Sequence, residues 1–271
     1  MGAGIAQIAS QVRCEVLFQN RKADSVDRGK AQIERSLGRL VSKGKFTQHQ
    51  AEGVLSRIRG VVALEELKTC DLVIECAPED IELKSELFGE IDEYVREDCL
   101  FATNTSSLSV TRLASCVSRP ERFVGMHFFN PVPLIRLVEI VKGIHTSKET
   151  VAAVVEFAER LDKLPIEVKD YPGFVVNRVL FPMINEAAFA LQEGVSDAKS
   201  IDACMQAGCN HPMGPLALAD LVGLDVVQAI LESLYREYGN PRYAPCLEIS
   251  KRVEAGWLGK KTGKGFYEYA K

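Results

Sequence analysis

The chain has 271 residues, of which 46% are hydrophobic and 26% are charged, and its formal net charge is −4. This is the composition of a globular protein with one or two domains, and its mildly acidic balance disfavours a general nucleic-acid or membrane-surface binder. No apolar run approaches the roughly 18 residues of a membrane-spanning helix, and the start of the chain lacks the basic region and cleavage site of a signal peptide.

The first two-thirds of the chain alternates short apolar runs with amphipathic segments. Strands are predicted at 15–19, 71–75, 99–103, 123–128 and 165–169, with a further candidate at 135–141. Helices are predicted at 23–42, 81–96 and 147–162. Strands separated by helices predict an α/β fold, a doubly wound parallel sheet with helices on both faces.

The character of the sequence changes at Asp170-Tyr171-Pro172-Gly173, where proline and glycine interrupt the pattern. Beyond this point helical periodicity dominates, with helices predicted at 175–192, 197–207, 217–235 and 243–254. We therefore expect two domains, an α/β domain over 1–170 and an all-helical domain over 171–271.

The chain opens on a glycine-rich segment, Met1-Gly2-Ala3-Gly4, which leads into a predicted helix and the strand at 15–19. A dinucleotide-binding fingerprint reads strand, GxGxxG, helix, and a second strand that ends in an acidic residue. Here the helix and second strand are present, but the first strand and the first two glycines are not. Taken alone, the segment is at least as typical of a small-residue helix start.

The second strand ends in Gln19, followed by the cations Arg21 and Lys22. An acid at the strand end would repel a 2′-phosphate, whereas glutamine with two nearby cations would tolerate one. A solvated helix start explains Arg21 and Lys22 equally well, so NAD and NADP both remain open.

Polar residues follow two further strands, at Asn104-Thr105-Ser106-Ser107 and at His127 to Asn130. Doubly wound sheets bind ligands at these strand ends. Glu139 lies in the apolar run 135–141, where a carboxylate needs a partner, and His127 is the obvious candidate. A satisfied core histidine is the alternative. If the two residues form a pair, we expect their side chains within about 2.6–3.2 Å of each other.

The eight cysteines and four histidines do not cluster at metal-ligand spacing. Reduced thiols in an intracellular, cytoplasmic protein are therefore favoured over disulfides, and nothing indicates a metal.

Together these segments resemble the L-3-hydroxyacyl-CoA dehydrogenase family, from residue 1 to about 269, and most of all its bacterial 3-hydroxybutyryl-CoA branch. The motifs that carry the resemblance are GAGIAQ, DLVIECAPEDIELK, NTSSL, HFFNP, LVEIV, PGFVVNR, GPLALADLVGLD and GKKTGKGFYEY. The resemblance implies a Rossmann-type NAD(P)-binding domain and a helical substrate-binding and dimerisation domain. It also implies interconversion of (3S)-3-hydroxyacyl-CoA, short-chain, and 3-ketoacyl-CoA by a homodimeric oxidoreductase of fatty acid and butyrate metabolism.

The resemblance also assigns site residues. It makes His127 the catalytic base and Glu139 its partner, with Ser106 and Asn177 beside the reacting oxygen and Asn130 as a further substrate contact. It places the cofactor near Gly2, Gln19, Glu79, Lys84 and Asn104, and the coenzyme A end of the substrate near Ser36, Lys43 and Lys45. From the residues alone, Glu79 with Lys84 is typical of a surface charge pair and the last three residues of a solvated helix face.

The missing strand and glycines depart from the family pattern. In a doubly wound sheet that strand is central, so we expect the natural protein to begin about 10–15 residues upstream. Without the strand, an open slot should separate 15–19 from 71–75 or 99–103, and the chain should fold poorly or bind NAD(H) weakly. A dehydrogenase of a free hydroxy or sugar acid, and a non-catalytic protein with a damaged cofactor site, stay open as alternatives.

Overall fold

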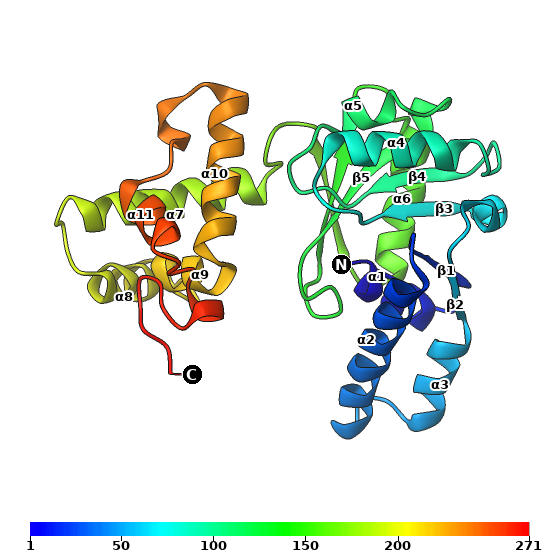
Figure 1. Cartoon of the computed structure of the whole chain (residues 1–271), viewed down its shortest axis with the longest axis horizontal. Helices are drawn as coiled ribbons and strands as arrows, with labels where there is room; N and C mark the ends of the chain where they lie inside the picture. Colours follow the sequence, from blue (N-terminus) through cyan, green and yellow to red (C-terminus); the bar gives the residue numbers. More distant parts are fainter. Residues whose placement is uncertain (271) are drawn as a thin grey trace. The chain divides into compact units, whose positions relative to one another are not determined.

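The structure is a computed structural model that describes residues 1–270. The chain divides into two compact units, Met1–Asp170 (unit 1) and Tyr171–Lys271 (unit 2), which are drawn together in Figure 1. Over the described residues, every helix is too short or too polar to cross a membrane.

Unit 1 alternates strands and helices along the chain. Its strands are β1 (Val16–Gln19), β2 (Ile58–Val61), β3 (Leu72–Glu75), β4 (Leu100–Thr103), β5 (Phe123–Phe128), β6 (Leu137–Lys142) and β7 (Leu164–Lys169). Its α-helices are α1 (Gly2–Gln11), α2 (Ala23–Ser42), α3 (Gln48–Ser56), α4 (Ile81–Asp92), α5 (Val110–Ala114) and α6 (Lys148–Arg160). Two 3₁₀ turns, Leu64–Thr69 and Pro120–Arg122, complete the unit.

Five of these strands form one sheet in the order β3-β4-β5-β6-β7, and β1 pairs with β2 separately. The pairs are parallel except for β5 with β6, which is antiparallel. The predicted doubly wound sheet is therefore confirmed, but it is mixed, because β5 and β6 are antiparallel where parallel strands were expected. Residues 129–136 join these two strands, and this connection is shorter than the dozen or more residues that a parallel crossover needs.

Helices cover both faces of the five-stranded sheet (Figure 1). On one face, Phe88 of α4 packs edge-on against Phe101 and Phe123, with ring centroids 6.1 and 4.6 Å away. On the other face, residues of α1 and α6 such as Ile5 and Val154 share a buried cluster with the strands. Successive residues of a strand point to opposite faces, which explains how each strand serves both layers.

The sheet is interrupted between β1 and β3. A cavity of about 1200 Å³ lies there, lined by both strands and by apolar residues of α1, α4 and α6. The slot predicted between 15–19 and 71–75 is therefore present, whereas the expected upstream start of the natural protein stays a prediction.

Unit 2 is helical. Within residues 171–270, its β-structure consists of two isolated β-bridges between residues 259 and 268. Its helices are α7 (Val176–Gln192), α8 (Ala198–Cys209), α9 (Pro215–Val222), α10 (Leu224–Tyr238) and α11 (Leu247–Glu254), with 3₁₀ turns at Pro241–Tyr243 and Lys260–Thr262. The single helix predicted over 217–235 was wrong, because Gly223 separates α9 from α10 with φ of 106°, a conformation that favours glycine.

Candidate active site

His127 and Glu139 face each other across neighbouring strands. The antiparallel register of β5 and β6 pairs these two residues directly. Directly opposed residues carry their side chains on the same face of the sheet, about 4.5–5.5 Å apart at Cβ. Nδ1 of His127 lies 2.7 Å from Oε2 of Glu139, so the predicted contact is confirmed.

This pair is almost entirely shielded from solvent. The side chains of His127 and Glu139 are 8% and 1% exposed, and the ring of Phe129 lies 4.4 Å from the imidazole, centroid to centroid. A carboxylate buried in this way needs a donor, which the Nδ1–H of the imidazole supplies. A neutral ring with its proton on Nδ1 carries its basic lone pair on Nε2, so Nε2 is the atom that can exchange a proton with a bound molecule.

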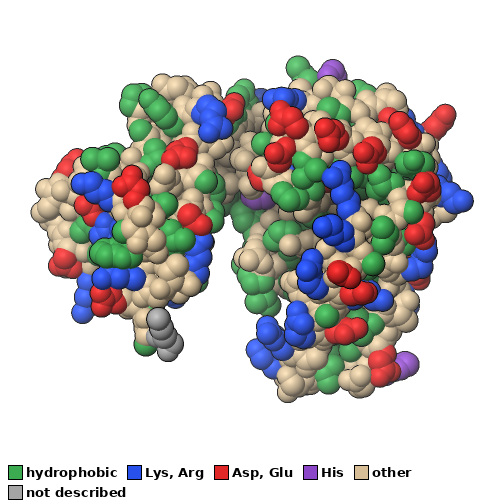
Figure 2. Space-filling view, viewed as in Figure 1, with side chains coloured by type: hydrophobic (Ala, Val, Ile, Leu, Met, Phe, Trp, Pro, Cys, Tyr) green, Lys and Arg blue, Asp and Glu red, His purple; other side chains and the backbone are tan. Residues whose placement is uncertain are grey.

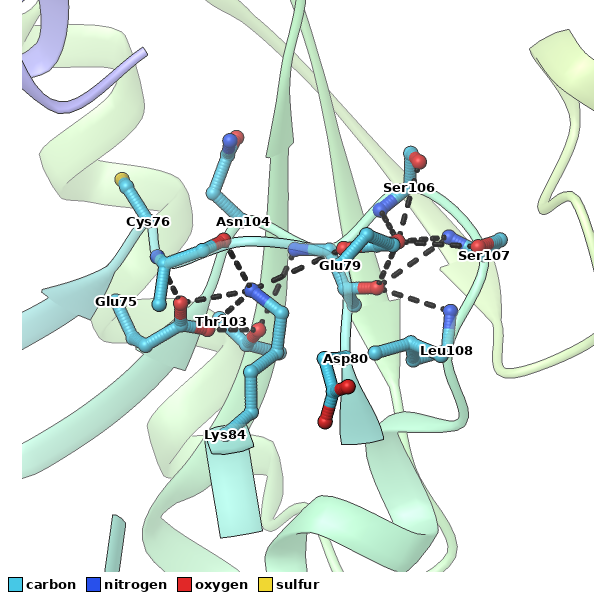
Figure 3. Close-up of polar contacts among 12 residues, drawn as sticks. Glu75, Cys76, Glu79, Asp80, Lys84, Thr103, Asn104, Ser106, Ser107 and Leu108 are labelled. Atoms are coloured by element: carbon cyan, nitrogen blue, oxygen red, sulfur yellow. Dashed lines mark hydrogen bonds and ion pairs between the residues drawn. The ribbon is translucent and has the colours of Figure 1, made fainter. Parts of the chain in front are cut away.

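A second buried carboxylate, which the sequence analysis missed, lies at the end of β3. Glu75 accepts hydrogen bonds from Nζ of Lys84 at 2.7 and 2.9 Å and from the hydroxyl of Thr103 at 2.8 Å (Figure 3). The side chains of Glu75 and Lys84 are each 1% exposed. The signal was present in the sequence, because the apolar run 72–75 ends in a carboxylate in the same way that 135–141 contains one.

Glu79 connects this ion pair to the loop after β4. Its Oε1 accepts the N–H groups of Ser106 and Ser107 at 2.8 and 3.0 Å and the hydroxyl of Thr105 at 2.6 Å, as Figure 3 shows. The hydroxyls of both serines also lie within 3.1 Å of Oε1, and Nζ of Lys84 lies 3.8 Å from Oε2.

These contacts set the charge of Glu79. Burial by itself would raise the pKa of the Glu79 carboxyl, but the hydrogen bonds from Thr105, Ser106 and Ser107 and the nearby charge of Lys84 outweigh it and hold the pKa below its usual range. An ionised Glu79 therefore fixes the backbone of the loop that carries Ser106.

Asn104 joins the ends of β4 and β5. Its Oδ1 accepts the N–H of Phe128 at 2.8 Å, one residue from His127. The carboxyl ends of the parallel strands β3, β4 and β5 lie at one edge of the sheet, where doubly wound sheets bind ligands. The structure thus brings Glu79, Lys84, Asn104 and Ser106 together at this edge.

The loop that contains Asn130 follows β5, and a buried lysine fixes its backbone by hydrogen bonds. Nζ of Lys163, a residue 7% exposed, donates to the carbonyls of Val132 and Ile135 at 2.6 and 2.8 Å. On the other side, a Cβ added to Gly4 would lie only 2.9 Å from Cβ of Val132, so α1 packs closely on the loop. Sequence reasoning missed Lys163, since a lysine before an edge strand is typical of exposed surface.

The amino end of α1 lies at the same edge as the carboxyl ends of β1 and β3. A Cβ added to Gly2 would lie 3.6 Å from the side chains of both Phe18 and Cys76. Helix amino ends bind phosphates, and Gln19 occupies the strand-end position where a ribose-binding acid stands in the fingerprint. Nε2 of Gln19 donates to the carbonyl of Val62 at 2.9 Å, and its half-buried amide retains an oxygen that can accept from a ribose hydroxyl. This donor set fits a dinucleotide.

The residues expected at the coenzyme A end lie elsewhere in unit 1, toward the carboxyl end of α2. Ser36 is half-buried, and Lys43 and Lys45 are exposed. Figure 2 shows Lys and Arg side chains over the part of unit 1 where Figure 1 draws α2. This basic helix face is available to an anionic group.

Asn177 lies in unit 2, in the first turn of α7, and is 6% exposed. Gly173 and Phe174, with φ of 79° and 49°, form a tight turn ahead of the helix. The turn accounts for the proline and glycine that mark the change of character in the sequence.

Two family models together match nearly the whole chain. The NAD binding domain of 3-hydroxyacyl-CoA dehydrogenase matches residues 1–171, and the C-terminal domain of 3-hydroxyacyl-CoA dehydrogenase matches residues 173–269.

Individual relatives agree with these matches. The chain is 45% identical over 271 residues to the 3-hydroxybutyryl-CoA dehydrogenase of Clostridioides difficile, covering 100% of this chain and 96% of that one. It is 41% identical over 277 residues to the mitochondrial hydroxyacyl-coenzyme A dehydrogenase of Sus scrofa, covering 99% and 88%. The crystal structure of (S)-3-hydroxybutyryl-CoA dehydrogenase from Ralstonia eutropha superposes with a TM-score of 0.97 at 48% identity, covering 100% and 96%.

Proposed function

Because the chain belongs to the 3-hydroxyacyl-CoA dehydrogenase family, we propose that it interconverts (3S)-3-hydroxybutyryl-CoA and acetoacetyl-CoA with NAD(H). The observation that carries the proposal is the buried pair of His127 and Glu139, joined at 2.7 Å beside the carboxyl edge of the sheet. This pair provides a proton acceptor in a shielded place, which oxidation of an alcohol requires.

In the oxidation direction, Nε2 of His127 takes the proton from the 3-hydroxyl of the substrate. Glu139 accepts the Nδ1–H throughout, keeps the ring oriented and stabilises the imidazolium that forms, as carboxylates do in such pairs. A bound nicotinamide supplies the acceptor for the hydride that leaves C3. In the reduction direction, His127 returns the proton to the oxygen at C3.

The remaining residues position the reactants. Ser106 and Asn177 would hydrogen-bond the oxygen at C3, and Asn130 would add a further substrate contact. Glu79 accepts the N–H of Ser106 at 2.8 Å, so it fixes the place of that serine as well as lying on the cofactor side. Lys84 is buried against Glu75 and would act mainly through the two glutamates.

Two further parts of the proposal concern the choice of cofactor and the binding of coenzyme A. Gln19 in place of an acid supports weak discrimination between NADH and NADPH. Ser36, Lys43 and Lys45 would bind the anionic end of coenzyme A, because cations on a helix face suit phosphate groups. A homodimer through unit 2 and a cytoplasmic location complete the proposal.

A parallel assay tests the reaction. The purified chain is given acetoacetyl-CoA or free acetoacetate, each with NADH and with NADPH. Turnover is measured as the loss of absorbance of the reduced nicotinamide. The proposal expects turnover of acetoacetyl-CoA and at least tenfold less of free acetoacetate. Equal turnover of the free acid would favour a hydroxy-acid dehydrogenase. An absence of turnover despite NADH binding in a fluorescence titration would contradict the proposal.

A further inference from the structure

Lys163 is a buried cation that has backbone carbonyls, and no carboxylate, as its partners. The residue is 7% exposed, and within residues 1–270 its ammonium forms no salt bridge. Removing an ammonium from water costs free energy, and lysine is rarely buried unless it is paired. The two hydrogen bonds that Lys163 donates to the loop after β5 must offset this cost, so they require an explanation.

The end of α6 fixes the backbone of this lysine. The chain leaves the helix through Asp162, whose φ of 56° lies in the left-handed region, and the N–H of Asp162 donates to the carbonyl of Glu159 at 2.9 Å. The N–H of Lys163 donates to the carbonyl of Ala158 at 3.0 Å. These are the two bonds of a Schellman motif, which ends a helix in a defined conformation. The side chain of Lys163 therefore starts from a fixed point.

The connection between β5 and β6 uses Lys163 to complete its hydrogen bonds. Within this loop, the carbonyl of Pro131 accepts the N–H groups of Leu134 and Ile135 at 2.9 and 3.1 Å, which closes a turn. Nζ of Lys163 donates to the carbonyls of Val132 and Ile135, and one ammonium can do so because it carries three donors. Bonds from a charged donor are stronger than those from a neutral one, so two points of the loop are held firmly on the end of α6.

The first part of the same loop lies beside the imidazole of His127. The ring of Phe129 is 4.4 Å from it, centroid to centroid. At the end of β5, Oδ1 of Asn104 accepts a backbone N–H at 2.8 Å, so the loop is fixed at its start by Asn104 and near its end by Lys163. Between these two points lies Asn130, which is exposed and can therefore reach a bound molecule.

We propose that Lys163 is a positioning residue for the reaction, which acts through Asn130 by holding the loop in the shape that brings this amide to the substrate. The inference rests on the proposed function, since it takes Asn130 as a substrate contact. A displacement of about 1 Å in a group that orients the substrate can lower the rate by about 10²-fold, so contacts at Val132 and Ile135 can control activity from a distance. The alternative is that Lys163 merely satisfies two buried carbonyls.

A double-mutant cycle separates these two roles. The kcat/KM for acetoacetyl-CoA is measured at saturating NADH for the wild type, Lys163→Met, Asn130→Ala and the double variant. Methionine keeps an unbranched apolar side chain but has no donor. Lys169→Met is the matched control, because Lys169 is exposed at the other end of β7, and it should change kcat/KM by less than twofold.

The inference expects Lys163→Met to lower kcat/KM at least tenfold in the wild type but less than threefold in the Asn130→Ala background, because the group through which Lys163 acts is then absent. Equal losses in both backgrounds would show a general effect on the fold and would overturn the inference, as would a loss below twofold in the wild type. If the methionine variant does not fold, the same cycle is run with Lys163→Gln, which keeps a shorter donor.

Backbone order in the loop tests the anchor without any turnover. In Lys163→Met, NMR order parameters of the Leu134 and Ile135 amides should fall from about 0.85 to below about 0.6. Those of Val138 and Ile140 in β6 should stay near about 0.85. Unchanged order in the loop, or an equal loss in β6, would overturn the inference. A wild type that binds NADH but does not reduce acetoacetyl-CoA would contradict the proposed function instead, and the order parameters would still decide whether Lys163 holds the loop.

Discussion

Two regions of unit 1, one at β5 and β6 and the other at β1 and β3, each bury a carboxylate, but they give it different partners. In the β5–β6 region, Glu139 lies on a strand paired on both sides and meets a histidine, which can gain and lose a proton. In the β1–β3 region, Glu75 lies on a strand paired on one side and accepts hydrogen bonds from Lys84, which also donates to the carbonyl of Ala77. The comparison separates a part of the sheet that is paired on both sides, where we propose that proton transfer takes place, from a part that borders the slot.

The largest expected effect is on the proton-transfer side. Replacing His127 by Gln should lower kcat for acetoacetyl-CoA reduction by about two to four orders of magnitude, the usual contribution of a general acid or base. The exposed His145 provides the matched control, and His145→Gln should leave kcat within about twofold. If His127→Gln kept more than a tenth of the activity, His127 would be a satisfied core histidine.

On the other side the largest effect should be on stability. Lys84→Met would leave Glu75 charged and buried without its partner, which costs about 3–5 kcal/mol of unfolding free energy. Urea denaturation measures this loss, with the exposed Lys68→Met as control. Combining Lys84→Met with Glu75→Gln should restore part of the stability, because no unpaired charge is then buried. A loss below about 1 kcal/mol for Lys84→Met would show that the pair does not hold this region together.

In the β1–β3 region we also expect weak discrimination between NADH and NADPH. With Gln19 at the end of β1, we expect NADPH to be used at no less than about a hundredth of the NADH efficiency, under about 2.7 kcal/mol of preference. The ratio of kcat/KM values for the two cofactors measures this directly, and Gln19→Asp should shift the ratio toward NADH. A wild-type preference of several thousandfold for NADH would contradict the expectation and make Arg21 and Lys22 a solvated helix start.

The smallest effect concerns Glu79, which links the loop of Ser106 to Lys84. Glu79→Gln should cost about 1 kcal/mol, since solvent screens this partly exposed group. The pKa of Glu79 is lowered in the folded state, so its contribution should be present above the unfolded value of about 4.3 and disappear as the pH falls through the lowered value.

Thermal melts between about pH 3 and 7 test the sign of this effect. The difference in Tm between the wild type and Glu79→Gln should be constant above about pH 5 and shrink at lower pH. Glu82, 72% exposed at its side chain, gives the control, and Glu82→Gln should show little difference at any pH. A difference that grows on acidification would contradict the role of an ionised Glu79.

Much of this site could be predicted from the sequence where periodicity and burial agree. The apolar run 135–141 predicted both a strand and a partner for Glu139, and the antiparallel register then made that partner His127. The slot between 15–19 and 71–75 was predicted as well, and the structure has a cavity between β1 and β3.

Other features depend on information that local patterns do not contain. β2 and α3 were not predicted, since residues 58–61 have only four positions and include a glycine, and α3 has nine residues with a weak apolar face. Glu75 was missed although the argument used for Glu139 applies to it, and its partner Lys84 is nine residues away on a helix. Lys163 binds two backbone carbonyls of a distant loop, a contact that only the tertiary fold specifies.

Backbone amide exchange in the chain tests the contrast between the two parts of the sheet most directly. In β6, which is paired with both β5 and β7, the amides of Val138, Glu139 and Ile140 should all be protected to a similar degree. The carbonyls of Asp71 and Glu75 accept from Leu100 and Asn104, so the backbone of Val73 also faces β4 and that of Leu72 and Ile74 faces the slot. In β3 the account therefore predicts alternation, with Val73 protected and Leu72 and Ile74 exchanging at least tenfold faster. Uniform protection along β3, equal to that along β6, would contradict the account, because it would mean that the slot is closed and the two sides of the sheet are alike.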